Sequence, residues 1–274
     1  DFLLFKKKIK NRNVKIISEN DLLKFSKFKK ISNSFLIKSR YYKEIQKRLS
    51  WYYQQILKLS FVINFINKKN KNIIIWDADT IIIKKIKFFH KKKSIKFGTT
   101  SEYHKAYYKT NKTILRKLPR YFVSSLCQFV GLSVIDQKFL KKKLKINKIK
   151  KNIALNISKT IMRAVKESHE IYNGSMFSEY ELIGQSNLLL DYSKQKLVSG
   201  LRDRLDGVLT DYQIKILKTL NFKYVAYEHT HQNFLSKNML KRNQSWLRFL
   251  ALLIKKLSNN LFRGLRHHLK YMIY

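Results

Sequence analysis

The chain has 274 residues, enough for one large domain or for one domain with an appendage. Hydrophobic residues make up 45% of it and aromatic residues 14%, so it can fill a core and is not a disordered polycation. Lysine and arginine outnumber aspartate and glutamate by 59 to 17, a formal net charge of +42, which is typical of proteins that bind nucleic acid or an anionic membrane.

The amino-acid usage gives this charge a second explanation. Lysine, isoleucine, asparagine, phenylalanine and tyrosine are abundant, whereas proline occurs once and glycine seven times. The abundant residues share A/T-rich codons, so a biased genome raises the lysine count without a polyanionic partner, and we favour this explanation. The few acidic residues are therefore informative. A single cysteine, Cys127, excludes an intramolecular disulfide and predicts a reducing, cytoplasmic compartment.

The first part of the chain predicts the start of an α/β sheet. Residues 1–13 are expected to end a basic amphipathic helix and residues 14–18 to form a short strand, with the first strand of the domain before Asp1. A polar, poorly patterned stretch follows to about residue 40. Residues 44–66 then predict the clearest helix of the chain. Its apolar stripe consists of Tyr52, Ile56, Leu59 and Ile63.

A polar stripe lies beside the apolar one on this predicted helix. Its members, which fall within an arc of about 100°, are Trp51, Gln54, Gln55 and Lys58. Two amides and a lysine in this position suit contact with a diphosphate or a sugar. A solvated helix face is the alternative.

Residues 73–83 stand out from the rest of the sequence. Three isoleucines precede Trp76-Asp77-Ala78-Asp79-Thr80, and three more follow. Such a short, β-branched run predicts a strand buried on both faces, and carboxylates inside it are costly unless a cation or hydrogen bonds hold them. Open α/β sheets bind ligands at strand ends, so Asp77 and Asp79 are predicted to hold a divalent metal against a diphosphate.

Shorter patterns predict the remaining elements. Strands are expected at residues 95–98, 121–135 and 222–227, a helix near 210–220, and loops at 88–93 and 203–207. The lysine-rich residues 141–151 are expected to form a solvated helix face or a loop. They are the best nucleic-acid candidate in the chain, but they lack interleaved aromatic residues for stacking on bases.

A second acidic cluster, Phe177-Ser178-Glu179-Tyr180-Glu181, follows a predicted turn. Ser178 and Glu181 fit a capping box, which gives Glu181 a structural explanation. Glu179 is expected at the first helical position, where it either complements the helix dipole or points into a cleft as a catalytic base.

Two regions near the C-terminus complete the candidate sites. His229 and His231 follow the predicted strand 222–227 and are candidates for a third metal ligand, with an ordinary surface position as the alternative. Residues 236–274 predict a basic amphipathic helical tail, for which we expect contact with an anionic membrane surface; packing onto the main domain is the alternative. Its first apolar stripe consists of Trp246, Phe249, Leu250, Leu253 and Leu257.

Two other classes of function fit parts of this sequence. A haloacid-dehalogenase-type phosphatase also places Asp-x-Asp after an apolar strand, but its threonine follows the second aspartate by two residues, where this chain has Ile81; Thr80 follows Asp79 directly. A basic nucleic-acid-binding protein explains the charge and leaves the buried acids unexplained. A metal-dependent glycosyltransferase accounts for both the D-x-D and the polar helix before it.

Three blocks, at residues 51–58, 76–80 and 177–181, resemble a bacterial family of nucleotide-diphospho-sugar transferases, similar in outline to GT-A glycosyltransferases of family eight. The resemblance implies an α/β, Rossmann-like fold with a mixed central sheet flanked by helices. It covers residues 1–235 as a catalytic domain, with residues 236–274 as a basic helical extension. The family-eight pattern of a glycine and Lys-Pro-Trp after the histidine is absent here.

The resemblance also implies a site. Asp77 and Asp79 would bind Mn²⁺ or Mg²⁺ at the diphosphate of a nucleotide-sugar donor, and Glu179 would deprotonate the acceptor hydroxyl in an inverting enzyme or bind sugar in a retaining one. The implied acceptor is a cell-surface polysaccharide or a lipid-linked saccharide at the inner membrane face, and nucleic acid is not an expected partner. The expected donor-site residues are Trp51, Gln54, Gln55, Lys58 and Trp76.

Overall fold

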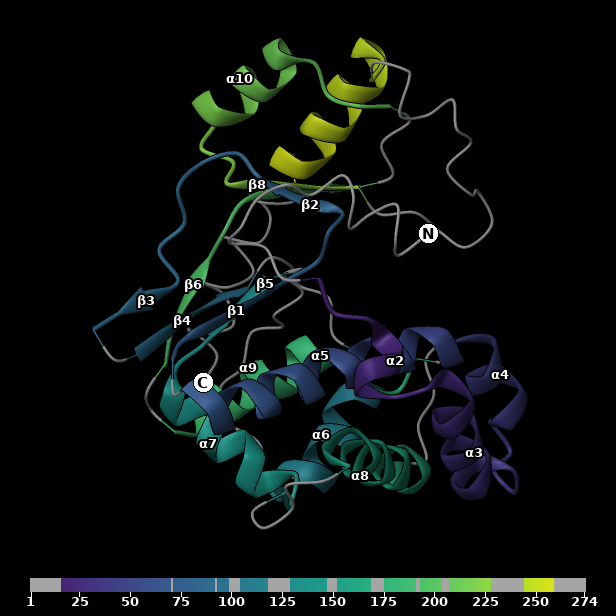
Figure 1. Ribbon diagram of the computed structural model, residues 1–274. Coiled ribbons are helices and arrows are strands. Elements are labelled where there is room, and N and C mark those ends of the chain that lie inside the picture. The colour runs from purple at the N-terminus through teal and green to yellow at the C-terminus, as the bar shows by residue number, and fades with distance from the viewer. Residues whose placement is uncertain are drawn as a thin grey trace, which may run out of the picture. The chain divides into compact units, whose positions relative to one another are not determined.

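The computed structural model divides the chain into two compact units (Figure 1). The helical unit comprises residues 1–73, 103–122 and 132–193, and the sheet unit comprises the rest. The residues that the structure describes are 16–69, 71–91, 93–98, 104–117, 129–146, 152–168, 175–190, 193–203, 207–227 and 244–258.

The helical unit packs its helices around α8. Apolar side chains recur along α8 at helical spacing, and this face packs against α3, α5 and α6, while α9 packs against α6 and α7. The described helices of this unit are α2 (Glu19–Leu22), α3 (Phe25–Leu36), α4 (Tyr42–Lys47), α5 (Leu49–Lys69), α6 (Lys105–Leu115), α7 (Val134–Lys143), α8 (Ile153–Ser168) and α9 (Glu179–Leu189).

The predicted helix at residues 44–66 is confirmed, with one break. It forms α4 and α5, which are separated by Arg48. Every residue of the predicted apolar stripe, Tyr52, Ile56, Leu59 and Ile63, is fully buried. Helical spacing of large apolar residues predicts this helix correctly, because this face meets other helices along its whole length.

Two expectations for the described residues before α4 are wrong. Residues 16–18 form no strand, because Ser18 takes the extended backbone conformation of the residue that precedes a helix, and α2 begins at Glu19. The stretch that looked poorly patterned contains α3, which buries Phe28 and Leu36 against neighbouring helices. The predicted helix at 1–13 lies outside the described residues.

The sheet unit carries the strands in three small sheets. β1 (Ile73–Trp76) pairs with β5 (Phe129–Leu132). β8 (Tyr224–Tyr227) lies between β2 (Thr80–Ile82), which is antiparallel to it, and β7 (Gly200–Asp203), which is parallel. β4 (Lys93–Gly98) lies between β3 (Phe89–His90) and β6 (Ser193–Leu197).

The α/β class is therefore confirmed, and the finer expectation of one mixed central sheet flanked by helices stays a prediction. Within the described residues the strands belong to sheets of two or three strands. The predicted strands at 95–98 and 222–227 correspond to β4 and β8, and the helix predicted near 210–220 is α10 (Asp211–Thr219).

Residues 73–83 differ from their prediction as a single strand buried on both faces. They form two strands, β1 and β2, in different sheets, with a turn between them. Ile74, Trp76 and Ile81 are exposed, whereas Ile75 is buried, so each strand buries alternate side chains. An uninterrupted apolar run predicts a strand that is buried on both faces, but here isoleucine also occupies exposed positions.

Three other boundaries differ from their predictions. Residues 88–93 are not a loop, because β3 pairs with the start of β4 around Lys91, which has a positive φ of 53°. The strand predicted to residue 135 ends at Leu132, since Ser133 and Asp136 form a capping box that starts α7. Asp203 ends β7 rather than beginning a loop.

The C-terminal part of the sheet unit has a core shared by its helices and strands. A helix spans residues 246–258, and its Phe249 and Leu253 are buried with Leu217 of α10 and Val225 of β8. Packing, the alternative interpretation of the tail, is thus confirmed for this helix. The predicted boundary near residue 235 lies outside the described residues. Among those that are described, no helix has the length and apolar character that crossing a bilayer requires.

Candidate functional site

The D-x-D residues lie in a turn held by backbone hydrogen bonds. The Asp77 carbonyl accepts a hydrogen bond of 3.1 Å from Thr80 N, and the Asp79 carbonyl accepts one of 2.9 Å from Tyr227 N. The Trp76 indole Nε1 donates to the Thr80 carbonyl at 2.7 Å. The turn therefore connects β1 to β2 in one defined conformation, closed by an indole on one side and by the end of β8 on the other.

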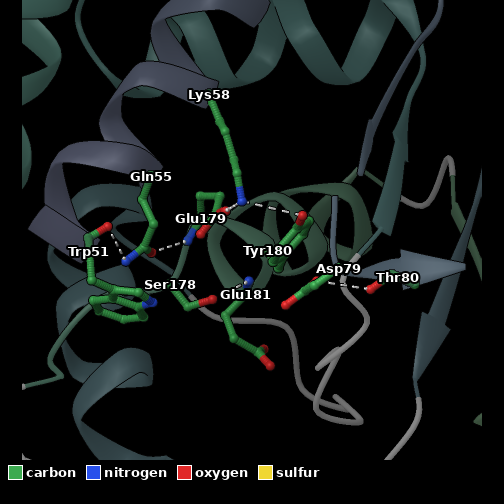
Figure 2. Close-up of polar contacts among 9 residues, drawn as sticks. All are labelled: Trp51, Gln55, Lys58, Asp79, Thr80, Ser178, Glu179, Tyr180 and Glu181. Carbon is green, nitrogen blue, oxygen red and sulfur yellow. Dashed lines mark hydrogen bonds and ion pairs between the residues drawn. The ribbon is translucent and has the colours of Figure 1, made fainter. Parts of the chain in front are cut away.

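The two carboxylates of this turn differ in exposure. Asp77 is half-buried and Asp79 is exposed, while the next residue, Thr80, is buried. Thr80 Oγ1 donates a 3.3 Å hydrogen bond to Asp79 Oδ1, as Figure 2 shows. Burial of the acids, which the sequence predicted, is thus wrong for Asp79. An exposed carboxylate keeps its hydration and needs no cation for the fold to be stable.

The donor chemistry of this turn suits a hard divalent metal. Mg²⁺ is usually held by one or two carboxylates together with waters and substrate phosphates, and Asp77 and Asp79 offer two carboxylates one residue apart. Within the described ranges, no three His, Cys, Asp or Glu side chains gather as a complete metal site. The two carboxylates by themselves fit part of such a coordination sphere.

The end of β8 lies beside this turn. Tyr227, the last residue of β8, donates its backbone N–H to Asp79, and Asp203 of β7 is its register partner on the other side. The register thus places the backbone of Asp203 at the same end of this sheet as the D-x-D turn, a placement that the sequence did not indicate. His229 and His231, the predicted third ligands, lie outside the described residues and follow Tyr227 by two and four positions.

A second polar cluster lies in the helical unit, between α5 and the start of α9 (Figure 2). Gln55 is buried and makes two hydrogen bonds: its Oε1 accepts from Glu179 N at 2.9 Å, and its Nε2 donates to the Trp51 carbonyl at 3.3 Å. The first N–H groups of a helix have no partner within the helix, so Gln55 satisfies one of them from another element.

Lys58, one turn further along α5, binds the side chain of Glu179. Its Nζ lies 2.8 Å from Glu179 Oε1, 3.5 Å from the Tyr180 hydroxyl and 4.8 Å from the centroid of the Tyr180 ring. The side chains of Lys58 and Glu179 are 18% and 3% exposed. Taking such a carboxylate out of water is costly unless a cation accompanies it, and Lys58 supplies that cation.

Glu181 has a different environment from Glu179. Its backbone N donates to Ser178 Oγ at 3.4 Å, so the predicted cap on α9 is formed by Ser178. Its buried carboxylate accepts a long hydrogen bond of 3.5 Å from the hydroxyl of Tyr108 in α6. The two glutamates of the first turn of α9 thus face different helices.

Arg48, Ser175 and Met176, which the sequence did not indicate, complete the surroundings of this cluster. Arg48 donates to Ser175 Oγ and also lies over the Trp51 ring, 5.4 Å from its centroid. The Tyr52 hydroxyl accepts from Met176 N at 2.8 Å. Ser175 and Met176 directly precede the acidic block, so these contacts join α5 to that segment. A lone arginine gives no signal in a chain with 59 basic residues.

Two tyrosines here titrate far from their ordinary range. Burial raises the pKa of Tyr107 to about 12, against the smaller lowering effects of its hydrogen bond with Ser175 and of the Arg48 charge, while both glutamates of α9 raise it slightly. Burial also raises the pKa of Tyr52 well above its usual value. The ring of Tyr107 stacks on Trp51, with centroids 6.3 Å apart.

The structure therefore brings some predicted site residues together and leaves others apart. Trp51, Gln55 and Lys58 form one cluster with Glu179 in the helical unit. Gln54, which the sequence placed in the same stripe, is exposed. Trp76, Asp77 and Asp79 form the D-x-D turn of the sheet unit, where the Trp76 indole has a structural role in closing the turn.

Comparisons of the chain with protein-family models, with curated proteins and with solved structures find no match.

Proposed function

We propose that this protein is a metal-dependent glycosyltransferase that uses a nucleotide-diphospho-sugar donor and a saccharide or lipid-linked acceptor. The observation that carries the proposal is the D-x-D turn. Asp77 and Asp79 follow a strand end, two backbone hydrogen bonds and one from an indole fix the turn, and Asp79 is exposed. Carboxylates presented in this way suit a metal that carries a diphosphate.

In this proposal Asp77 and Asp79 hold Mn²⁺ or Mg²⁺. When bound, the metal supplies positive charge that stabilises the diphosphate of the leaving nucleotide. Thr80 contributes by donating a hydrogen bond to one oxygen of Asp79. A chain with a net charge of +42 also attracts anionic donors over long distances, so we expect donor association to slow as salt is added.

Glu179 is the proposed base for the acceptor hydroxyl. Its ion pair with Lys58 favours the carboxylate form, which is the form that accepts a proton, and Gln55 fixes the backbone of the same residue. The same contacts suit a role that is only structural. Kinetics distinguishes the two roles, because loss of a base lowers kcat while donor binding is retained.

The metal assignment is tested by titration calorimetry of the full chain with Mn²⁺ and a panel of uridine, guanosine and thymidine diphosphate sugars. We expect Asp79→Ala and Asp77→Asn to abolish metal-dependent donor binding without changing the thermal unfolding of the apoprotein. The control is Asp211→Asn, which removes an exposed carboxylate from α10 in the same unit. Donor binding that is unchanged in both D-x-D variants would disprove the assignment.

The same preparation tests nucleic acid as the alternative partner. Tight, sequence-independent DNA binding that weakens steeply with salt, together with no donor binding, would replace the proposal by a nucleic-acid-binding function. Weak DNA binding alongside metal-dependent donor binding is the expected result, since any chain of this charge attracts polyanions.

A further inference from the structure

The helix at residues 246–258 presents a row of large apolar side chains to the solvent. Leu247 is 85% exposed and Ile254 is 66% exposed. On α10 beside it, the ring of the exposed Tyr212 lies 5.7 Å from that of Trp246 in an edge-on contact. We call this set the outer apolar face, and its members are Tyr212, Trp246, Leu247, Leu250, Ile254 and Leu257.

This face borders the buried side of the same helix, and that buried side holds the helix in place. Phe249 and Leu253 are buried in the core of the sheet unit with residues of β7, β8 and α10, as the position of the yellow helix beside α10 in Figure 1 illustrates. The start of the helix is also fixed, because Gln244 accepts from Gln213 Nε2 at 3.0 Å through its carbonyl and from Gly207 N at 3.2 Å through Oε1.

The structure therefore divides the apolar stripe that the sequence predicted for the tail. Phe249 and Leu253 serve the core, whereas Leu247 and Ile254, which lay outside the predicted stripe, are exposed. At 100° per residue, the five apolar members from this helix fall within an arc of about 100°. Arg248 and Lys255, both exposed, lie about 180–200° around the helix from Trp246.

This arrangement is typical of helices that lie at a membrane interface. An amphipathic helix that lies in the plane of a bilayer inserts Trp and Leu on one side and carries Lys and Arg on the other. Tyrosine and tryptophan rings are enriched at the level of the headgroups, and Tyr212 and Trp246 meet at one end of this face. Lys215 and Lys218 of α10, the helix that carries Tyr212, are also exposed.

We propose that the outer apolar face docks on the surface of an anionic membrane, with Leu247 and Ile254 entering the headgroup region. Charge decides between this occupant and a second copy of the chain. Each copy carries a formal charge of +42, so pairing two such faces brings like charges together, whereas an anionic bilayer attracts them. The inference goes beyond sugar transfer and does not depend on it.

The test is flotation of the full chain with vesicles of phosphatidylcholine alone or with about a third phosphatidylglycerol, a content that gives a clearly negative surface. The variants are Leu247→Glu, Ile254→Glu and the double change. Ile37→Glu is the matched control, since Ile37 is 62% exposed in the helical unit and receives the same charge change. Thermal unfolding verifies that each variant is folded.

We expect the wild type and Ile37→Glu to float with anionic vesicles only. The double variant is expected to bind these vesicles at least about tenfold more weakly than the wild type. Three results would overturn the proposal. Equal flotation of the double variant and the control would mean that binding depends on overall charge. A dimer that Leu247→Glu dissociates, without lipid binding, would assign the face to a second copy. A lowered unfolding temperature without lipid binding would show that another part of the chain covers it.

Discussion

The side chain of Gln55 completes the N-terminus of a helix 124 residues away, since its Oε1 accepts a 2.9 Å hydrogen bond from the backbone N of Glu179. Lys58 binds the side chain of the same glutamate from the next turn of α5. One residue of α9 is thus fixed through both its backbone and its carboxylate by one face of α5. This double attachment makes the cluster testable for stability and for activity separately.

Gln55→Ala is expected to lower the free energy of unfolding by about 1–3 kcal/mol, because it leaves the buried N–H of Glu179 without this acceptor. Urea denaturation followed by circular dichroism measures the change. Gln54→Ala removes the neighbouring exposed amide from the same helix and is expected to stay within about 0.5 kcal/mol of the wild type. Equal losses in both variants would mean that the hydrogen bond contributes nothing.

The ion pair of Lys58 with Glu179 predicts strong coupling between two variants. Lys58→Met removes the cation beside a buried carboxylate. Loss of one partner of a buried ion pair lowers the free energy of unfolding by about 3–5 kcal/mol, and we expect a value near the lower end because Lys58 is partly exposed. Adding Glu179→Gln removes that carboxylate, so the double variant should recover much of the loss. A double-mutant cycle by urea denaturation gives the coupling energy.

The same unit offers a control for this cycle. Lys47 and Glu44 form an ion pair of similar length, 2.9 Å, with side chains that are 69% and 49% exposed. Exposed pairs contribute about 0–1 kcal/mol, so Lys47→Met should be nearly neutral. A coupling energy for Lys58 and Glu179 no larger than that of the exposed pair would contradict the structural role. Lowered kcat with unchanged donor binding in Glu179→Gln would support the additional role as a base.

The sequence predicted some residues of this cluster and not their contacts, because the residues differ in the sequence pattern to which they belong. Tyr52 and Ile56 recur at helical spacing, and this pattern fixed α5 and the face that carries Gln55 and Lys58. Glu179 was noticed because acids are rare in this chain. That it meets Lys58 was not predictable, since the contact joins positions 121 residues apart and depends on how α5 and α9 pack.

The sheet unit was harder to predict for a physical reason. Isoleucine is so common in this chain that an apolar run does not distinguish a buried strand from one that exposes alternate residues, as Ile74 and Ile81 do. Strand partners also depend on distant pairing: Tyr227 lies beside Asp79 only because β2 and β8 are neighbours. The two acids of the D-x-D indicated a site in the sequence, whereas the strands that pair around its turn were not predictable.

The raised pKa of Tyr107 predicts a loss of stability at high pH. Its pKa is about 12 in the folded protein and 10.0 in an ordinary tyrosine, so between these values the native state keeps a proton that the unfolded chain releases. The free energy of unfolding therefore falls as pH rises from about 10 to about 12, by up to about 1.4 kcal/mol per pH unit for this group.

Tyr107→Phe removes the titrating group, so the free energy of unfolding should fall less steeply with pH in this variant. The difference between the two slopes should correspond to about one proton. Urea denaturation of both proteins at several pH values measures the difference, and lysine titration is common to both and cancels. Below about pH 9 the two slopes should agree, because the phenol is protonated in both states there. Identical slopes above pH 10 would contradict the buried, protonated state of Tyr107.

The hydrogen bond from Tyr227 N to Asp79 gives the predicted histidine ligands a specific test. His229 and His231 follow Tyr227 in the sequence by two and four residues. If His229 ligates, His229→Ala should weaken Mn²⁺ binding by about tenfold or more, and binding should also weaken below about pH 6.5, where imidazole protonates. Titration calorimetry with Mn²⁺ and donor measures both effects, and His231→Ala provides the comparison. Full Mn²⁺ affinity in both histidine variants, together with no Mn²⁺ binding by Asp79→Ala, would leave Asp77 and Asp79 as ligands and remove the histidines from the site.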